Sequence, residues 1–241
     1  MKTIDVGTIC QLRRYPVKSM GGEPLPEARL GWHGVRGDRR AALLRLDDES
    51  GLPFLSARQL PELLTYRATI PGTEETPILV VTPAGDSLRF EDPVLVSELS
   101  SLAGTPVRAI HLWRGCFDSM PISIVTTASL QALEGDLGTS LEVDRFRPNI
   151  VVELASASEA YAEDRWLGRR LTFGGGDAAQ ARCNRKTTRC RVVNHDTKTA
   201  SANNAIHSFL ATRRKNLFGV YASPEHPGVL RVGDTVRLIS D

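Results

Sequence analysis

A chain of 241 residues can bury one large hydrophobic core or two small ones. Apolar residues make up 41% and charged residues 24%, which excludes a disordered or fibrous protein and predicts a soluble globular one. The formal charge of +2, from 30 Lys and Arg against 28 Asp and Glu, is too small to predict nucleic-acid binding, so any anion site must be local.

The first part of the chain is predicted to be rich in β-strands. Residues 8–17 alternate imperfectly and stop at Pro16, which indicates a strand running into a loop that carries Lys18 and Ser19. Short β-compatible runs separated by Gly, Pro and Asp follow at residues 41–46, 68–70 and 77–82, and they predict an antiparallel meander. Short stretches of helical spacing lie at residues 59–64 and 94–99, and Gly104 can end the second.

A second unit is predicted to begin near Pro93, which divides the chain into domains 1–92 and 93–241. A strand at 122–126 leads into a helix from Ser129. Further strands are predicted at residues 149–154, 171–173, 191–193 and 235–239, with a helix at 205–215. Many short strands with few helices favour a mainly β, α+β fold, in which an N-terminal β-rich domain packs on a β-barrel. No glycine-rich phosphate fingerprint follows a strand, which argues against a doubly wound nucleotide-binding sheet.

The cysteines and the hydropathy pattern predict a cytoplasmic protein. No segment approaches the about 18 uninterrupted apolar residues of a membrane span. Four cysteines are too few for a disulfide scaffold in a chain of this length, so we expect free thiols that can bind metal or act in catalysis.

Cys190 is the most informative thiol because Arg189 and Arg191 flank it. Adjacent cations favour the thiolate, which is the form that binds metal. A buried structural cysteine in a charged strand is the plainer interpretation. Two others are weaker: a zinc site with Cys183, His195 and His207, whose spacing is too long for a zinc knuckle, and a nucleophilic pair of Cys190 with His195.

Lys18, Arg39 and Arg147 each lie near a conformationally restricted neighbour, namely Pro16, Gly37 and Pro148. Such positions often present a side chain inward from a turn. A lysine ammonium group is a point charge for phosphate, whereas a planar arginine guanidinium can donate two parallel hydrogen bonds to it. Further directional hydrogen bonds could come from Ser19, Thr126, Thr127 and Asn149. Each cation alone is more simply a solvated surface residue, whereas the whole set predicts an anion site.

The motifs that carry these residues resemble the MOSC superfamily over almost the whole chain. They are Tyr15-Pro16-Val17-Lys18-Ser19, Gly37-Asp38-Arg39, Ser56-Ala57-Arg58-Gln59-Leu60-Pro61, Phe146-Arg147-Pro148-Asn149-Ile150, Arg189-Cys190 and Gly233-Asp234. The chain is most similar to two-part proteins with an N-terminal β-rich domain before a MOSC barrel, namely bacterial relatives of the mitochondrial amidoxime-reducing component.

The resemblance implies a molybdenum cofactor (Mo-molybdopterin) with Cys190 as the metal ligand and catalytic residue. It implies that the pterin and its phosphate are held by Lys18, Ser19, Arg39, Thr126, Thr127, Arg147, Asn149, Arg189 and Cys190. The reaction implied is two-electron reduction of small N-hydroxylated compounds such as hydroxylamines or amidoximes. Electrons are expected from a separate donor protein, because some relatives append a ferredoxin domain that this chain lacks. Asp164 or a water is a candidate proton donor.

Two other functions stay open from the sequence. The chain could carry the cofactor or a persulfide on Cys190 without turnover, since MOSC domains also end molybdenum-cofactor sulfurases. It could also be an interaction domain in which the motifs stabilise the barrel, with Asp38 paired to Arg39 or Arg58 and with Phe146 and Pro148 in the core.

Overall fold

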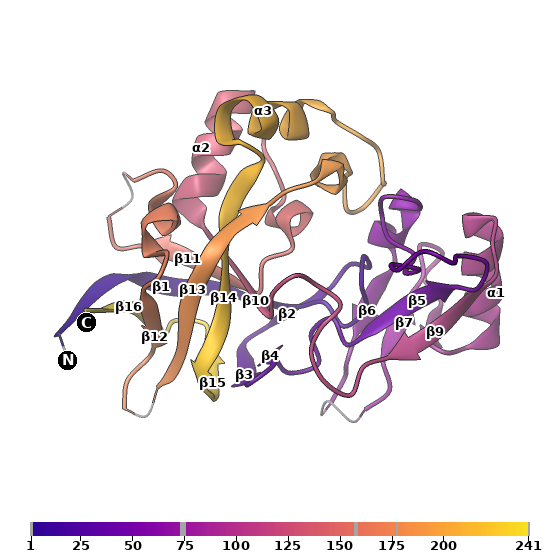
Figure 1. The fold of residues 1–241 in the computed structure, drawn as a ribbon, viewed down its shortest axis with the longest axis horizontal. Coiled ribbons are helices and arrows are strands. Elements are labelled where there is room, and N and C mark those ends of the chain that lie inside the picture. Colours follow the sequence, from indigo (N-terminus) through magenta and orange to yellow (C-terminus); the bar gives the residue numbers. More distant parts are fainter. Residues whose placement is uncertain (1, 73–75, 157–158, 177, 241) are drawn as a thin grey trace.

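The computed structural model describes residues 2–72, 76–156, 159–176 and 178–240. Figure 1 shows a barrel of strands on one side, a smaller β-rich half beside it, and two helices over one end of the barrel. The predicted class, mainly β with a few short helices, is confirmed. The division at residues 92 and 93 stays a proposal.

Seven strands close the barrel because β1 pairs on one side with β16 and on the other with β11. In their order around the barrel they are β11 (Ile150–Leu154), β10 (Ile122–Thr126), β14 (Leu217–His226), β13 (Ala179–Thr188), β12 (Arg170–Phe173), β16 (Thr235–Ser240) and β1 (Lys2–Arg14). A short strand, β2 (Glu23–Leu25), extends the sheet along the end of β1. Closure leaves the barrel with no free edge between these seven strands.

Alternating side chains fill the barrel. In β13, Ala179, Ala181 and Cys183 point inward and are fully buried, whereas the residues between them are partly exposed. Larger side chains such as Phe173 and Trp166 complete the same core. The barrel is therefore a packed core, and any ligand must bind outside it.

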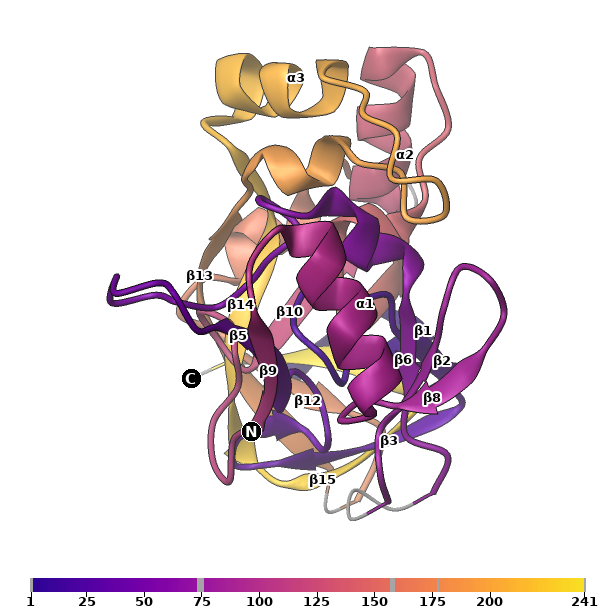
Figure 2. The same cartoon turned by 90° about the vertical axis from the view of Figure 1, so that its right-hand side faces the viewer.

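Strands β10 and β11 are parallel, and α2 (Thr127–Leu137) makes the crossover between them. The Thr126 hydroxyl caps α2 by accepting a hydrogen bond from the amide of Ser129, and Gly138 ends it in the left-handed conformation. Figure 2 shows α2 beside α3 (Ala205–Arg214) above the barrel. A second core lies between these helices and the strands.

The smaller half has its own core. Strand β5 (Ala41–Arg45) pairs with β9 (Val107–His111), and a second sheet contains β6 (Arg67–Thr69), β7 (Leu79–Val81) and β8 (Ser87–Arg89). Helix α1 (Pro93–Ala103) begins at the cap residue Asp92 and packs Leu95 and Leu99 on these strands. A third sheet joins β3 (Glu27–Gly31) to β4 (Gly34–Val35) and β15 (Gly228–Arg231).

Several predicted elements are wrong in kind or extent. The strand predicted at 191–193 is a 3₁₀ helix, Arg191–Asn194, and the helix predicted at 59–64 is a 3₁₀ helix, Pro61–Thr65. The predicted meander is confirmed for β6 and β7, which pair antiparallel, but it is wrong for β5, which pairs with β9 and not with β6. The ten-residue strands β13 and β14 were not predicted, and two further 3₁₀ helices span Val143–Phe146 and Ala162–Trp166.

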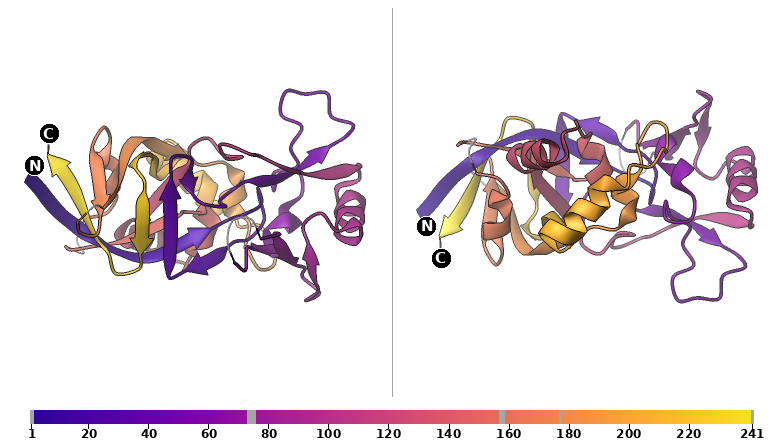
Figure 3. Two further views of the ribbon diagram at one scale, coloured as in Figure 1. Left: turned by 90° about the horizontal axis from the view of Figure 1, so that it is seen from below. Right: turned by 90° about the horizontal axis from the view of Figure 1, so that it is seen from above.

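The first and last strands lie side by side, with Lys2 opposite Ser240, at the end of the molecule away from α1 (Figure 3). In the part of the chain that the structure describes, no helix has both the length and the apolar character needed to cross a bilayer.

Gly7 limits how closely β1 and β11 can approach. A Cβ at Gly7 would lie 2.1 Å from the carbonyl oxygen of Glu153, on the strand across the closure. At Gly135, on the exposed face of α2, a Cβ would meet nothing within 4 Å.

We therefore expect opposite effects from two identical substitutions. Gly7→Ala should lower the free energy of unfolding by about 1–3 kcal/mol because it overpacks the closure. Gly135→Ala should raise it by about 0.5–1 kcal/mol because alanine favours helix. Urea unfolding followed by circular dichroism measures both, and a neutral Gly7→Ala would contradict the role given to this contact.

Candidate functional site

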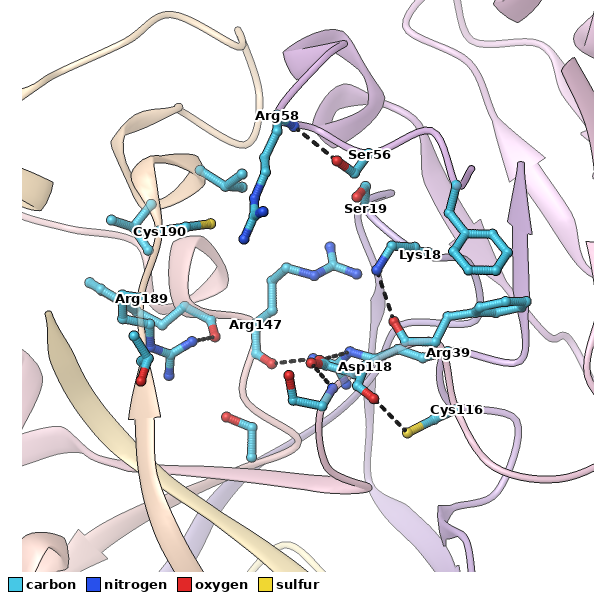
Figure 4. A pocket seen from close by; sticks show the side chains of 18 of the residues that line it. Lys18, Ser19, Arg39, Ser56, Arg58, Cys116, Asp118, Arg147, Arg189 and Cys190 are labelled. Atoms are coloured by element: carbon cyan, nitrogen blue, oxygen red, sulfur yellow. Dashed lines mark hydrogen bonds and ion pairs between the residues drawn. The ribbon is translucent and has the colours of Figure 1, made fainter. Parts of the chain in front are cut away.

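A cavity of about 620 Å³ lies between the barrel and the smaller half. The smaller half contributes Lys18, Arg39 and Arg58, and the barrel side contributes Arg147, Arg189 and Cys190 (Figure 4). Segments far apart in the sequence therefore bring cations and one thiol to a common space.

Three of the lining residues have left-handed backbones that L-residues rarely adopt. The φ angle is 67° at Ser19, 49° at Arg39 and 49° at Arg147. Such conformations cost about 1–3 kcal/mol each and are concentrated at functional sites. The predicted turns at these motifs are therefore present, and they project the side chains of Arg39 and Arg147 into the space between the two halves.

Arg39 joins the walls of the cavity. The residue is 4% exposed, and its guanidinium contacts four groups: the carboxylates of Asp38 and Asp118, the carbonyl oxygen of Arg147 and the side-chain oxygen of Asn149. The Nε to Asp118 distance is 2.9 Å, and the Nη2 to Arg147 oxygen distance is 2.7 Å. Burial lowers the pKa of Arg39, but the two carboxylates outweigh it, and the net pKa is raised.

Arg147 and Arg189 are held by carbonyl groups instead of carboxylates. Arg147 donates to the carbonyl of Met20 and lies over the ring of Tyr15, 4.4 Å from its centroid. Arg189 donates to the carbonyls of Phe146, at 2.6 Å, and Phe218, at 2.9 Å. Burial is the main cause that lowers the pKa of both guanidinium groups. Their charges are therefore oriented but not neutralised.

Lys18 and Asp118 both line the cavity but have different charge environments. The Lys18 ammonium donates to the carbonyl of Phe117 at 3.1 Å, and burial lowers its pKa, with neighbouring guanidinium groups adding to the effect. Burial raises the pKa of Asp118, but Arg39 and the hydrogen bonds from Ser119 and Tyr221 bring it below its usual value. Asp118 is the one carboxylate among the described lining residues.

Cys190 follows the last residues of β13 and precedes the 3₁₀ helix Arg191–Asn194. The residue is half-buried, and its sulfur points into the cavity (Figure 4). Cys183, in contrast, is buried in the barrel core, and the described residues contain no group of three or more His, Cys, Asp or Glu that could hold a metal. The zinc interpretation is therefore not supported. His195, the other member of the nucleophilic pair considered for Cys190, has its Nδ1 atom 3.0 Å from the carbonyl oxygen of Ala200.

Six of the nine predicted cofactor residues line the cavity: Lys18, Ser19, Arg39, Arg147, Arg189 and Cys190. The other three do not. Asn149 is 1% exposed and supports Arg39, Thr126 is fully buried and donates to Glu163, and Thr127 is the first residue of α2. Asp164, the candidate proton donor, lies outside the cavity lining and is ion-paired with Lys186 and Arg214.

Arg58, Asp118 and Tyr221 are among the lining residues that sequence reasoning did not assign to the site. Arg58 stands in a motif that was recognised, but its side chain was considered only as a pairing partner of Asp38 and not as part of the cofactor site. Tyr221 lies in β14, a strand that was not predicted, and its hydroxyl donates to Asp118 at 3.0 Å. Two contacts expected for an interaction domain are also present: Asp38 pairs with Arg39, and Phe146 is buried.

Two family models together match most of the chain. The family model of the MOSC domain matches residues 110–237, and that of the MOSC N-terminal beta barrel domain matches residues 6–103. Human mitochondrial amidoxime-reducing component 1 is 27% identical, over 98% of this chain and 84% of the relative. Human mitochondrial amidoxime reducing component 2 is 26% identical, over 96% and 83%.

A solved structure shares the fold over the full length. The YuaD protein from Bacillus subtilis superimposes with a TM-score of 0.50 at 13% identity, covering 100% of this chain and 98% of that one. At this identity the likeness concerns the fold alone. Because the MOSC domain model by itself matches more than half of the residues, the chain belongs to the MOSC domain family.

Proposed function

We propose that this protein binds a molybdenum cofactor and reduces small N-hydroxylated compounds. The observation that carries the proposal is one cavity that holds the Cys190 thiol together with Lys18, Arg39, Arg147 and Arg189. The likeness to amidoxime-reducing components supports the choice of substrate class.

The residues of the cavity fit such a group. A thiolate is a soft ligand suited to molybdenum, and a phosphate requires local cations. Nη2 of Arg189 and the hydroxyl of Ser123 are buried in the cavity wall without a hydrogen-bond partner among the described residues. Buried polar atoms without partners are costly, so a ligand that supplies acceptors would stabilise this wall.

In this proposal Cys190 holds the metal, and Lys18, Arg147 and Arg189 hold the pterin and its phosphate. When bound, the cofactor supplies the redox chemistry that takes two electrons to the N–O bond of the substrate. The overall balance is R–NHOH plus two electrons and two protons giving R–NH₂ and water, with the electrons supplied by a separate reduced electron-transfer protein.

Tyr221 contributes a phenolic hydroxyl to the lining of the cavity. Burial and the charge of Asp118 raise its pKa to about 12, so the hydroxyl stays protonated at neutral pH. Its hydrogen bond to Asp118 fixes its orientation. We therefore propose Tyr221 in place of Asp164 as the side chain that supports protonation of the leaving oxygen.

Besides orienting Tyr221, Asp118 balances the positive charge of the cavity. It is the carboxylate that Arg39, Lys18 and Tyr221 share, and its side chain is 24% exposed.

All four cysteines are free, which supports the further proposal of a cytoplasmic, reducing location.

Cys190→Ser should abolish molybdenum retention and leave the fold intact, because it replaces a soft, readily ionised thiol by a hydroxyl that stays protonated at neutral pH. Cys116→Ser is the matched control, since Cys116 is also half-buried in the cavity wall but has no assigned role. Both variants and the wild type would be produced in cells that make the cofactor. Molybdenum is measured by mass spectrometry, released pterin by fluorescence, and amidoxime turnover by product formation.

Equal molybdenum and pterin in the wild type and the Cys116 control, with molybdenum lost in Cys190→Ser, would support cofactor binding. Unchanged molybdenum in Cys190→Ser would exclude Cys190 as the ligand. A loaded wild type that turns over no hydroxylamine or amidoxime with a chemical electron donor would favour a cofactor carrier, and a folded wild type without either component would favour a persulfide carrier.

Asp118→Asn should lower the free energy of unfolding by about 2 kcal/mol at pH 7, because Arg39 and Lys18 lose their shared counter-charge. The folded-state pKa of Asp118 is lowered. The ionised carboxylate therefore stabilises the fold above the ordinary carboxyl pKa of about 4, and this contribution is lost as the pH falls through the folded-state value. The difference from wild type should therefore shrink in acid. Denaturant unfolding between pH 7 and pH 3 tests this. Asp5→Asn is the control, because Asp5 forms an exposed ion pair with Arg237. A difference that is independent of pH would contradict it.

A further inference from the structure

The other cations of the cavity have protein partners, whereas the Arg58 side chain has none among the residues that the structure describes. Arg39 and Arg145 are ion-paired to carboxylates, and Lys18, Arg147 and Arg189 donate to backbone carbonyls. The Arg58 guanidinium makes no hydrogen bond or ion pair with the residues that the structure describes. It is also an exposed residue, so its charge is available to something that enters from solvent.

The backbone beneath Arg58 is nevertheless fixed. Its amide donates to the Ser56 hydroxyl, and the amides of Gln59 and Leu60 donate to the Ser56 carbonyl at 2.9 and 3.0 Å. The preceding residue, Ala57, is 1% exposed, so the turn is anchored by a buried side chain. Only the side chain extends into the cavity, where Figure 4 shows it pointing toward the space that the Cys190 sulfur also faces.

No carboxylate in the described cavity wall is free for Arg58. Asp118 already accepts from Arg39, Ser119 and Tyr221. The positive charge of Arg58 is also felt at Lys18, where it helps to lower the pKa of the ammonium group. An anion bound by Arg58 would therefore relieve repulsion as well as gain a forked hydrogen bond.

We infer that Arg58 selects substrates with an anionic oxygen group, a carboxylate or phosphate, in addition to the N-hydroxylated nitrogen. The inference rests on the proposed function, because that function assigns Lys18, Arg147 and Arg189 to the cofactor and leaves Arg58 for the substrate. Arg58 acts as a specificity-determining residue at the mouth of the cavity, and the cofactor is held without it.

The first test does not depend on turnover. Iodoacetate and iodoacetamide alkylate the same thiolate, and only iodoacetate is negatively charged. The ratio of their rates at Cys190 therefore reports local positive charge and is independent of the fraction of thiolate. Full-length protein from cells unable to make the cofactor would be used, its folded state verified by cooperative thermal unfolding, and alkylation of Cys190 would be quantified by peptide mass spectrometry.

Arg58→Gln should lower the iodoacetate to iodoacetamide rate ratio at Cys190 by about threefold. Arg213→Gln is the matched control, because it removes the same charge from an exposed position on α3 and should leave the ratio unchanged. Equal ratios for wild type and Arg58→Gln would overturn the inference.

The second test uses loaded protein. Arg58→Gln should keep wild-type molybdenum and pterin, and it should lower kcat/KM for 4-carboxybenzamidoxime about tenfold more than kcat/KM for uncharged benzamidoxime. Loss of pterin from the variant, or equal effects on the two substrates, would overturn the inference. If neither substrate is turned over by loaded wild type, the reductase function fails, whereas a changed alkylation ratio would still support anion binding by Arg58.

Discussion

The buried guanidinium of Arg39 is the interaction on which the site depends. It joins Asp38 on its own segment to Asp118, to the carbonyl of Arg147 and to Asn149, so one side chain connects the smaller half to two parts of the barrel side. A lysine could not replace it, because an ammonium group is compact and lacks the planar fork that directs several hydrogen bonds at once. The cavity walls keep their spacing because this one charge is satisfied from several directions.

The remaining cations are arranged on a different principle. Carbonyl oxygens orient Arg147, Arg189 and Lys18, but a carbonyl carries no net charge and does not cancel the cation that it holds. A single carboxylate, Asp118, is set among them in the described wall. The cavity therefore combines rigid geometry with an excess of positive charge, which is the condition for attracting a phosphate-bearing ligand from solution.

Local patterns explain which parts of the fold the sequence could predict. Helix α1 has an aspartate cap, a proline at its first position and a glycine at its end, and each acts within a few residues. Strand β13 was missed because its buried residues are small, as at Ala179, Ala181 and Cys183, and its outward residues are polar or charged. The valines of Arg191–Asn194 have high β propensity, but there the chain turns into a 3₁₀ helix. Long-range contacts, such as Tyr221 with Asp118, have no local signal.

At Ser19, with its left-handed backbone, selection for thermal stability and selection for the side chain of the site favour different residues. Glycine adopts that conformation without strain, so a screen for thermal stability alone would favour glycine at this position over serine. At Arg39 and Arg147 the same exchange would leave carboxylates and carbonyls without donors, which offsets the relief of strain. A laboratory lineage selected only for heat resistance would thus be expected to lose the Ser19 hydroxyl first, while its fold improved and its arginines persisted.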